Sequence, residues 1–171
     1  MDQKMFCYQC QETAGCKGCT VVGVCGKQQD VAAMQDLLVW VTKGICAVTT
    51  RLREEGRAVA DEVNHLVTEN LFTTITNANF DKAAIEKRIE KTLEMKTALW
   101  EQLERRDNLP EAAGWTGEPS EFIKKASEAG VLIGQNEDII SLRSLITYGL
   151  KGLSASVSYT HLRAHETKAN L

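Results

Sequence analysis

The N-terminal segment contains the feature that most constrains this chain, a dense cluster of cysteines. Five of the six cysteines fall at positions 7, 10, 16, 19 and 25, and glycines interrupt the same stretch at positions 15, 18, 23 and 26. A segment so short and so rich in glycine cannot bury a core of its own. Residues 1–28 are therefore predicted to form a cysteine-rich loop built around a bound group.

The spacing of these cysteines points to a metal centre. Four of them follow the pattern Cys7-x2-Cys10-x8-Cys19-x5-Cys25, and Cys16 is an additional thiol. A Cys-x2-Cys pair places two thiolates at adjacent corners of a metal centre, and glycines let backbone N–H groups approach the sulfurs. Four cysteine ligands suit either an iron–sulfur cluster or a tetrahedral zinc ion.

Zinc is the main alternative, because Cys7-x2-Cys10 and Cys16-x2-Cys19 also resemble two zinc-knuckle pairs. With zinc, the chain would be a small helical interaction module. Disulfides are less favoured, since five clustered cysteines leave one unpaired. The bacterial ferredoxin spacing, Cys-x2-Cys-x2-Cys-x3-Cys-Pro, is absent. On spacing alone, the cluster and the zinc ion both stay open.

The composition is that of an ordinary globular protein, with 43% hydrophobic and 25% charged residues and a formal net charge of −3. Such a charge leaves no electrostatic footprint for nucleic acid. The polar start MDQKMFCYQCQE is no signal peptide, and no apolar run approaches a membrane span, so we expect a cytoplasmic protein without a membrane partner. Lys4, Lys17 and Lys27 can offset part of the thiolate charge.

From Gln29 onward, apolar residues recur at alternating steps of three and four, which is typical of amphipathic helices. The predicted helices cover 30–56, 59–75, 81–103, 120–130 and 136–153. Asp30, Asp81 and Ser120 are the predicted N-caps, and the prolines and glycines of 107–119 predict a loop. No alternating strand pattern occurs, so we predict an all-α fold in which residues 29–155 form an antiparallel helix bundle.

Outside the loop, the other residues with metal-binding side chains indicate no second site. Cys46 follows the apolar stripe of the first helix and is expected to be a small core residue. His65 is a lone histidine on a helix. His161 and His165 are spaced i and i+4, but they stand in a polar tail without a further ligand pair. No catalytic residue is predicted in this chain.

The sequence MFCYQCQETAGCKGCTVVGVCGK, residues 5–27, resembles the start of the hybrid-cluster protein family, also known as prismane proteins or hydroxylamine reductases. The similarity continues in MQDLLVWVTKGICAVTTRLREEG from Met34 and in IGQNEDIISLRSLITYGLKGLSA from Ile133 to Ala155. The QCQET and GVCGK motifs argue against a relative of the nickel carbon monoxide dehydrogenases, which share the broader fold.

The resemblance implies that Cys7, Cys10, Cys19 and Cys25 bind a cluster near the protein surface. The short x8 and x5 spacings resemble the type that holds [4Fe–4S], with Cys16 outside the ligand set. The family reduces hydroxylamine to ammonia and water, and some members reduce nitric oxide. That chemistry takes place at a hybrid [4Fe–2O–2S] cluster, whose ligands lie later in the family's sequence.

By this resemblance, the chain is expected to be the electron-transfer part of such an enzyme and to be inactive by itself. Its expected partners are a redox donor protein and the missing C-terminal domains of the same protein. After Ala155 the resemblance is expected to end, because the segment 156–171, SVSYTHLRAHETKANL, resembles translated library-adapter sequence. This tail is predicted to be non-native, and an intact genomic locus encoding it would refute the prediction.

Overall fold

The computed structural model describes the backbone of residues 5–75, 78–134 and 136–169, with side chains up to residue 160. Lys4 and the side chains of His161 and His165 lie outside this description. The helices are α1 (Gln29–Glu54), α2 (Asp61–Thr73), α3 (Lys82–Trp100), α4 (Glu111–Gly114), α5 (Phe122–Ala129) and α6 (Glu137–Ala169), with 3-10 turns at Ala14–Cys16 and Pro119–Glu121. No strand longer than an isolated bridge occurs in the described ranges, which confirms the all-α class.

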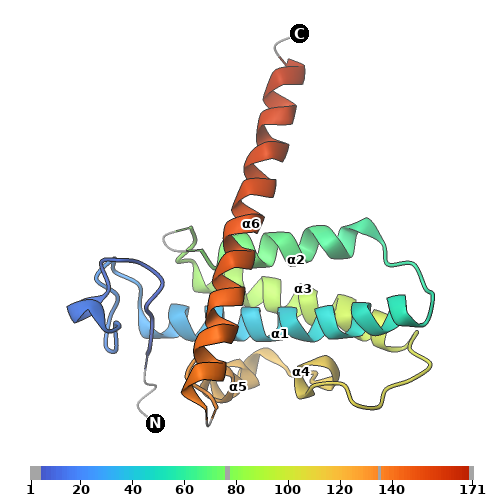
Figure 1. Ribbon diagram of the computed structural model, residues 1–171, viewed down its shortest axis with the longest axis horizontal. Helices are drawn as coiled ribbons and strands as arrows, with labels where there is room; N and C mark the ends of the chain where they lie inside the picture. Colours follow the sequence, from blue (N-terminus) through green and yellow to red (C-terminus); the bar gives the residue numbers. More distant parts are fainter. Residues whose placement is uncertain (1–4, 76–77, 135, 170–171) are drawn as a thin grey trace.

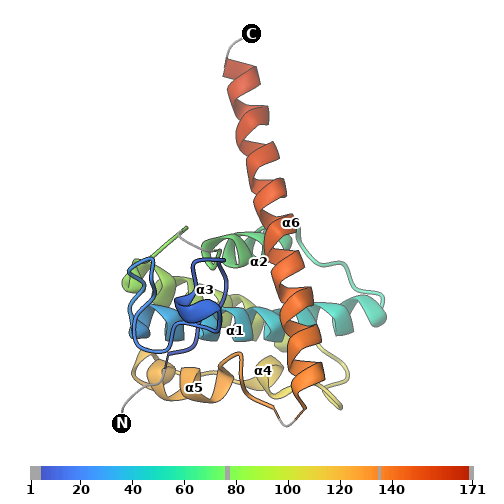
Figure 2. The same cartoon turned by 60° about the vertical axis from the view of Figure 1, so that its left-hand side comes forward.

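Helix α1 is the centre of the molecule. It packs against α3, α4 and α5, and to a smaller extent against α2. Figure 1 shows α1 and α3 running together, with α2 on one side of them and α4 and α5 on the other. Helix α6 packs on α2, and both views show it crossing the other helices and extending well beyond them (Figures 1 and 2). It therefore does not join the antiparallel array that the sequence predicted.

Two apolar clusters along α1 form the core. The first joins α1 to α3 and α5 and contains Val31, Met34, Leu37, Leu38, Val41, Ile85, Ile89, Leu93, Phe122 and Ala126. The second joins α1 to α2, to the end of α3 and to α4, and contains Ile45, Val48, Leu52, Val63, Leu66, Leu99, Leu103 and Ala113. Fully burying one large aliphatic side chain stabilises a fold by roughly 1.5–3 kcal/mol. The predicted apolar face of α1 therefore contributes most to the stability of the fold.

A buried polar contact complements this core between α1, α2 and α3. The amide of Asn70, which is 1% exposed, donates to Oγ1 of Thr42 at 3.2 Å and to Oγ1 of Thr92 at 2.8 Å. Arg88 donates to the side-chain oxygen Oδ1 of Asn70 at 3.4 Å. One side chain thereby fixes α2 against both neighbouring helices.

The helix ends confirm one predicted cap and correct another. Asp81 caps α3, since its Oδ1 accepts the N–H of Ala84 at 3.1 Å. The prediction for Asp30 was wrong, because Gln28 occupies the N-cap position of α1. Asp30 lies in the first turn instead, where its carboxylate interacts favourably with the helix dipole.

The segment 107–119 and the predicted cap at Ser120 also differ from expectation. The predicted loop contains a one-turn helix, α4, which is too short to produce a periodic pattern in the sequence. Lys96 of α3 holds it by donating to the carbonyl oxygen of Ala112 at 2.7 Å. Ser120 lies inside the 3-10 turn Pro119–Glu121, whose N-cap is Glu118, and the N–H of Glu118 donates to Oε2 of Glu121 at 3.0 Å. The N-cap of α5 itself is Glu121, so the prediction for Ser120 was wrong.

The expectation that no apolar segment approaches the length of a membrane span was wrong for α1. By length and apolar composition alone it is long enough to cross a membrane, but 67% of the apolar window is buried inside the bundle. Core helices of globular proteins pass the same test. The burial shows that the apolar character of α1 serves the core described above.

The apolar stripe of α6 is not buried among the described residues, contrary to the prediction for this helix. Leu142, Ile146 and Leu153 are 60%, 63% and 61% exposed. The helix instead buries Lys151 and Ser154, because it meets α2 and the cysteine loop through its polar side. These polar contacts bring α6 to the candidate site.

Candidate metal centre

The cysteine loop runs from the N-terminus to the start of α1, and an antiparallel bridge closes it. The N–H of Cys7 donates to the carbonyl oxygen of Cys19 at 3.0 Å, and the N–H of Cys19 donates to that of Cys7 at 2.8 Å. Cys19 is buried and packs with Met5 against Ala32 of α1. The fold therefore places two of the four predicted ligands together, at the N-terminal end of α1 (Figure 1).

The sulfur of Cys19 accepts a backbone hydrogen bond and lies beside a hydroxyl group. The backbone N–H of Ala14 donates to Cys19 Sγ at 3.5 Å, and Oγ1 of Thr13 lies 3.6 Å from the same sulfur. The backbone N–H groups of Ala14 and Val24 lower the pKa of this thiol, although burial opposes them. A lowered pKa favours the thiolate, which is the form of cysteine that binds metal.

A buried lysine lies beside the sulfur of Cys7. Lys27 is 2% exposed, and its Nζ lies 3.9 Å from Cys7 Sγ and 2.6 Å from Oε1 of Gln35. Gln35 is also 2% exposed, and its amide donates to the carbonyl oxygen of Asn79 at 2.9 Å. The ammonium group is thus held in a fixed position against a predicted ligand.

The remaining loop cysteines are more open to solvent. Cys25 is exposed in a tight turn, in which the N–H of Gly23 donates to the carbonyl oxygen of Lys27 at 2.8 Å. Cys10 is half-buried, and Cys16 is exposed with a left-handed φ of 56°. In the described part of the chain, no three His, Cys, Asp or Glu side chains are grouped so that they could hold a metal ion. The structure pairs Cys7 with Cys19 but does not gather all four predicted ligands.

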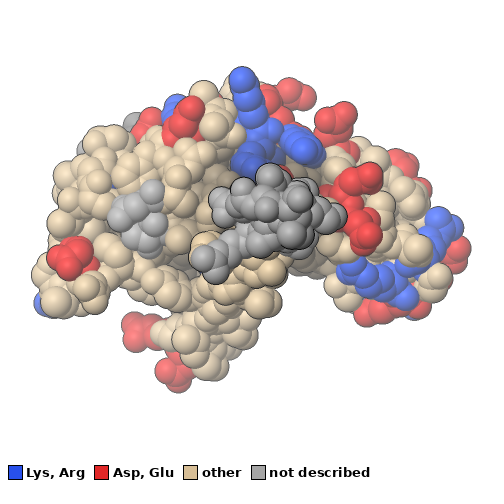
Figure 3. All heavy atoms as spheres, turned by 90° about the horizontal axis from the view of Figure 1, so that it is seen from above, with Lys and Arg blue, Asp and Glu red and all other residues tan. Residues whose placement is uncertain are grey.

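Part of the loop surface is apolar. Val21, Val22 and Val24, which lie between the last two predicted ligands, are 70%, 45% and 62% exposed. Figure 3 shows few charged side chains at the loop end on the left, whereas both signs of charge mix at the opposite end.

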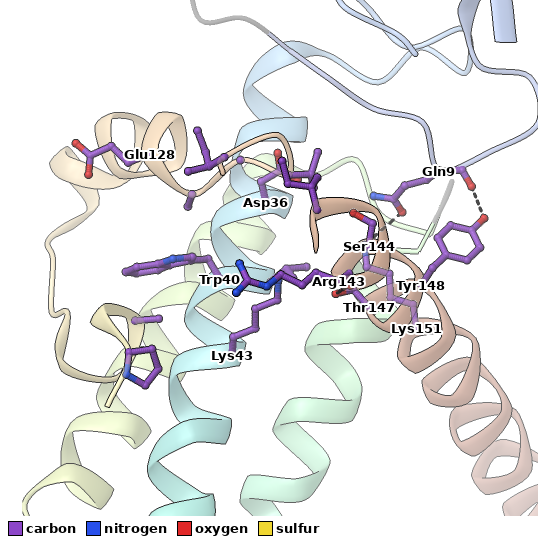
Figure 4. A pocket seen from close by; sticks show the side chains of 18 of the residues that line it. Gln9, Asp36, Trp40, Lys43, Glu128, Arg143, Ser144, Thr147, Tyr148 and Lys151 are labelled. Atoms are coloured by element: carbon purple, nitrogen blue, oxygen red, sulfur yellow. Dashed lines mark hydrogen bonds between the residues drawn. The ribbon is translucent and has the colours of Figure 1, made fainter. Parts of the chain in front are cut away.

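Helix α6 reaches the loop between its first two cysteines. The hydroxyl of Tyr148 donates to the backbone carbonyl oxygen of Gln9 (Figure 4). Lys151 donates to Oε1 of Gln9 at 3.3 Å and to the carbonyl oxygen of Thr74 at 3.2 Å. Two side chains of α6 thus fix the segment that joins Cys7 to Cys10.

A cavity of about 420 Å³ lies next to this contact, between α1, α5 and α6. In Figure 4, Arg143 extends from α6 toward Trp40 and Lys43 of α1. Desolvation raises the pKa of Asp36 to about 7 and lowers the pKa of Lys151 to about 8. Burial, together with repulsion from Arg143, lowers the pKa of Lys43.

No sequence pattern predicted a role for Asp36, Gln35, Tyr148 or Lys151. Gln35 carried a detectable signal, because it follows Val31 by four residues and is a polar side chain on the apolar face of α1. The contacts of Tyr148 and Lys151 with Gln9 join residues more than a hundred positions apart, so no local pattern signals them. Cys46 is half-buried and burial raises its pKa, which fits the predicted inert core residue.

Comparison with known proteins places this loop in a family. The profile of the "Prismane/CO dehydrogenase family" matches residues 5–169. The chain belongs to this family. The match runs past Ala155, so the expectation that the resemblance ends there was wrong. The non-native origin of 156–171 stays a prediction.

Several relatives within the family are enzymes named hydroxylamine reductase. The relative from Clostridium perfringens is 52% identical over 169 residues, which cover 95% of this chain and 31% of the relative. The relative from Desulfovibrio desulfuricans is 49% identical and that from Bacteroides fragilis 47%, covering 97% and 95% of this chain. The chain spans 31%, 31% and 30% of these three relatives, so it corresponds to the N-terminal part of such an oxidoreductase.

The chemistry of the donor set fits the iron–sulfur group that the resemblance implies. Thiolate sulfurs of such clusters accept N–H bonds and are stabilised by nearby positive charge. Cys19 accepts an N–H bond from Ala14, and Cys7 lies beside the ammonium of Lys27. Cys10 and Cys25 supply two further free thiols from the same loop.

Proposed function

We propose that this chain is the N-terminal, electron-transferring part of a hydroxylamine reductase and that Cys7, Cys10, Cys19 and Cys25 bind a [4Fe–4S] cluster. Such a cluster, when bound, accepts and releases single electrons. The proposal rests mainly on the contacts of Cys7 and Cys19. A backbone N–H donates to the sulfur of Cys19, and a buried ammonium group lies beside the sulfur of Cys7. The similarity to proteins named hydroxylamine reductase supports it.

The chain's own residues perform three tasks in this proposal. The N–H groups of Ala14 and Val24 stabilise negative charge on Cys19. Packing of Cys19 against α1 excludes water from the inner side of the loop. The exposed outer side, with Cys25 and its neighbouring valines, leaves the site open to a redox donor protein.

The complete enzyme reduces hydroxylamine in this proposal, and nitric oxide is a second candidate substrate. Hydroxylamine takes up two electrons and two protons and yields ammonia and water. The catalytic hybrid [4Fe–2O–2S] cluster belongs to the part of the relatives that this chain does not span, so the chain alone is expected to be inactive. We place the enzyme in the cytoplasm, where a reducing compartment keeps clustered thiols free.

Anaerobic reconstitution with iron and sulfide tests the cofactor. We expect about four iron and about four sulfide per chain and a centre that becomes paramagnetic on one-electron reduction, as a [4Fe–4S] cluster requires. One tightly bound zinc ion without sulfide would instead support a zinc-stabilised helical module and would refute the proposal.

Two cysteine variants of the same loop test the ligand assignment. Cys19→Ser removes the buried thiol that accepts the Ala14 N–H, and we expect it to abolish cluster binding. Cys16→Ser removes an exposed thiol outside the ligand set and is expected to leave iron and sulfide content unchanged. Equal loss in both variants would contradict the assignment.

A further inference from the structure

Lys27 differs from the other described lysine of the cysteine loop in being buried. Lys17 is exposed, whereas Lys27 is 2% exposed. Its ammonium contacts the Gln35 amide oxygen at 2.6 Å, the Cys7 sulfur at 3.9 Å and, at 5.8 Å from the centroid, the ring of Phe80. No salt bridge joins Lys27 to a carboxylate in the part of the chain that the structure describes.

A buried ammonium group without an anionic partner is costly, because water solvates it far better than neutral side chains do. Gln35 and Phe80 are neutral. Asp36 interacts electrostatically with Lys27, but no salt bridge joins the two side chains, and desolvation raises the pKa of this carboxyl to about 7. The remaining group beside the ammonium is the sulfur of Cys7.

We infer that Lys27 is the fixed countercharge of the cluster held at Cys7 and that it raises the cluster's reduction potential. Gln35 is the positioning residue of this pair, since its oxygen accepts the Lys27 ammonium and its amide is anchored on Asn79. The inference rests on the proposed function and goes beyond it, because it names one side chain that raises the reduction potential of the cluster.

The sign of the effect follows from charge. One-electron reduction adds one negative charge to the cluster, and a nearby cation stabilises the reduced form more than the oxidised form. The interaction is strong because Lys27 is buried, and dissolved salt screens buried pairs much less than exposed ones. Lys17 is exposed, so its influence on the potential is small and is lost at high salt.

Redox titration of the reconstituted 171-residue chain tests this, with the reduced cluster followed by electron paramagnetic resonance. Lys27→Met and Lys27→Gln remove the charge, Lys27→Arg keeps it, and Lys17→Met is the matched control in the same loop. We expect a more negative midpoint in both neutral Lys27 variants, at low and at high salt. Lys27→Arg and Lys17→Met should stay close to the wild type.

The outcomes separate this inference from the proposed function. Equal midpoints in the wild type and the neutral Lys27 variants, with equal cluster content, would overturn the role of Lys27 and leave the proposed function intact. Cluster loading in Lys27→Arg but not in the two neutral variants would support the countercharge. Loss of the cluster in all three Lys27 variants would overturn it, because the charge would then not matter. A wild type without iron and sulfide would refute the proposed function itself.

Discussion

At Gly44, helix α1 lies very close to the backbone of α4. A methyl group at this position would lie 2.1 Å from the carbonyl oxygen and 2.6 Å from the carbonyl carbon of Ala112. Both distances are far below van der Waals contact, so Gly44→Ala forces the backbone of α4 away from α1. The same carbonyl oxygen accepts a hydrogen bond from the buried ammonium of Lys96 at 2.7 Å, and moving α4 weakens that bond as well.

The size of the effect follows from these two contacts. Overpacking a core costs about 1–3 kcal/mol, and a hydrogen bond to a charged group contributes about 1.5–3 kcal/mol. Because the bond weakens but need not break, we expect Gly44→Ala to lower the free energy of unfolding by about 2–4 kcal/mol. For a chain of this length, each kcal/mol shifts the melting temperature by about 2–4 °C.

Gly152→Ala is the matched control, since Gly152 lies within α6 and a methyl group there would meet no atom within 4 Å. Replacing this helical glycine by alanine is expected to stabilise the chain by about 0.5–1 kcal/mol. Urea unfolding followed by far-UV circular dichroism measures both variants. A Gly44→Ala protein as stable as the control would refute the close packing of α4 on α1.

Three further predictions concern the bundle. The pKa of Asp36 is about 7 in the folded chain, against an ordinary value of 3.8, so the folded state holds a proton that the unfolded state releases. The free energy of unfolding of the wild type should therefore fall relative to that of Asp36→Asn as the pH rises from about 4 to 7. Curves of unfolding free energy against pH that run parallel for the two proteins would contradict this. Asn70→Ala leaves the hydroxyls of Thr42 and Thr92 without their donor. Denaturant unfolding should show that the free energy of unfolding falls by about 1–3 kcal/mol, and an unchanged unfolding midpoint would contradict the buried contact. Asp81→Ala removes the cap of α3 and should cost about 1 kcal/mol; Asp81→Asn, which can still accept the hydrogen bond, should recover most of that loss.

The helices and the cysteine loop could be predicted from the sequence because their signals are local. The stripe from Val31 to Leu52 repeats with the period of an α-helix and is buried as predicted. Asp81 precedes its helix by one residue, so a short-range rule identified the cap. The spacing of Cys7, Cys10, Cys19 and Cys25 indicated a metal centre for the same reason, and that assignment stays a prediction.

The environment of the site was decided by tertiary structure alone. The sequence treated Lys4, Lys17 and Lys27 alike, yet the fold buries Lys27 against Cys7 because α1 brings Gln35 beside it. It also predicted an apolar face of α6 in the core, whereas the fold buries Lys151 of that helix against Gln9. Such contacts join distant positions, and their free energies depend on burial, which no local pattern encodes.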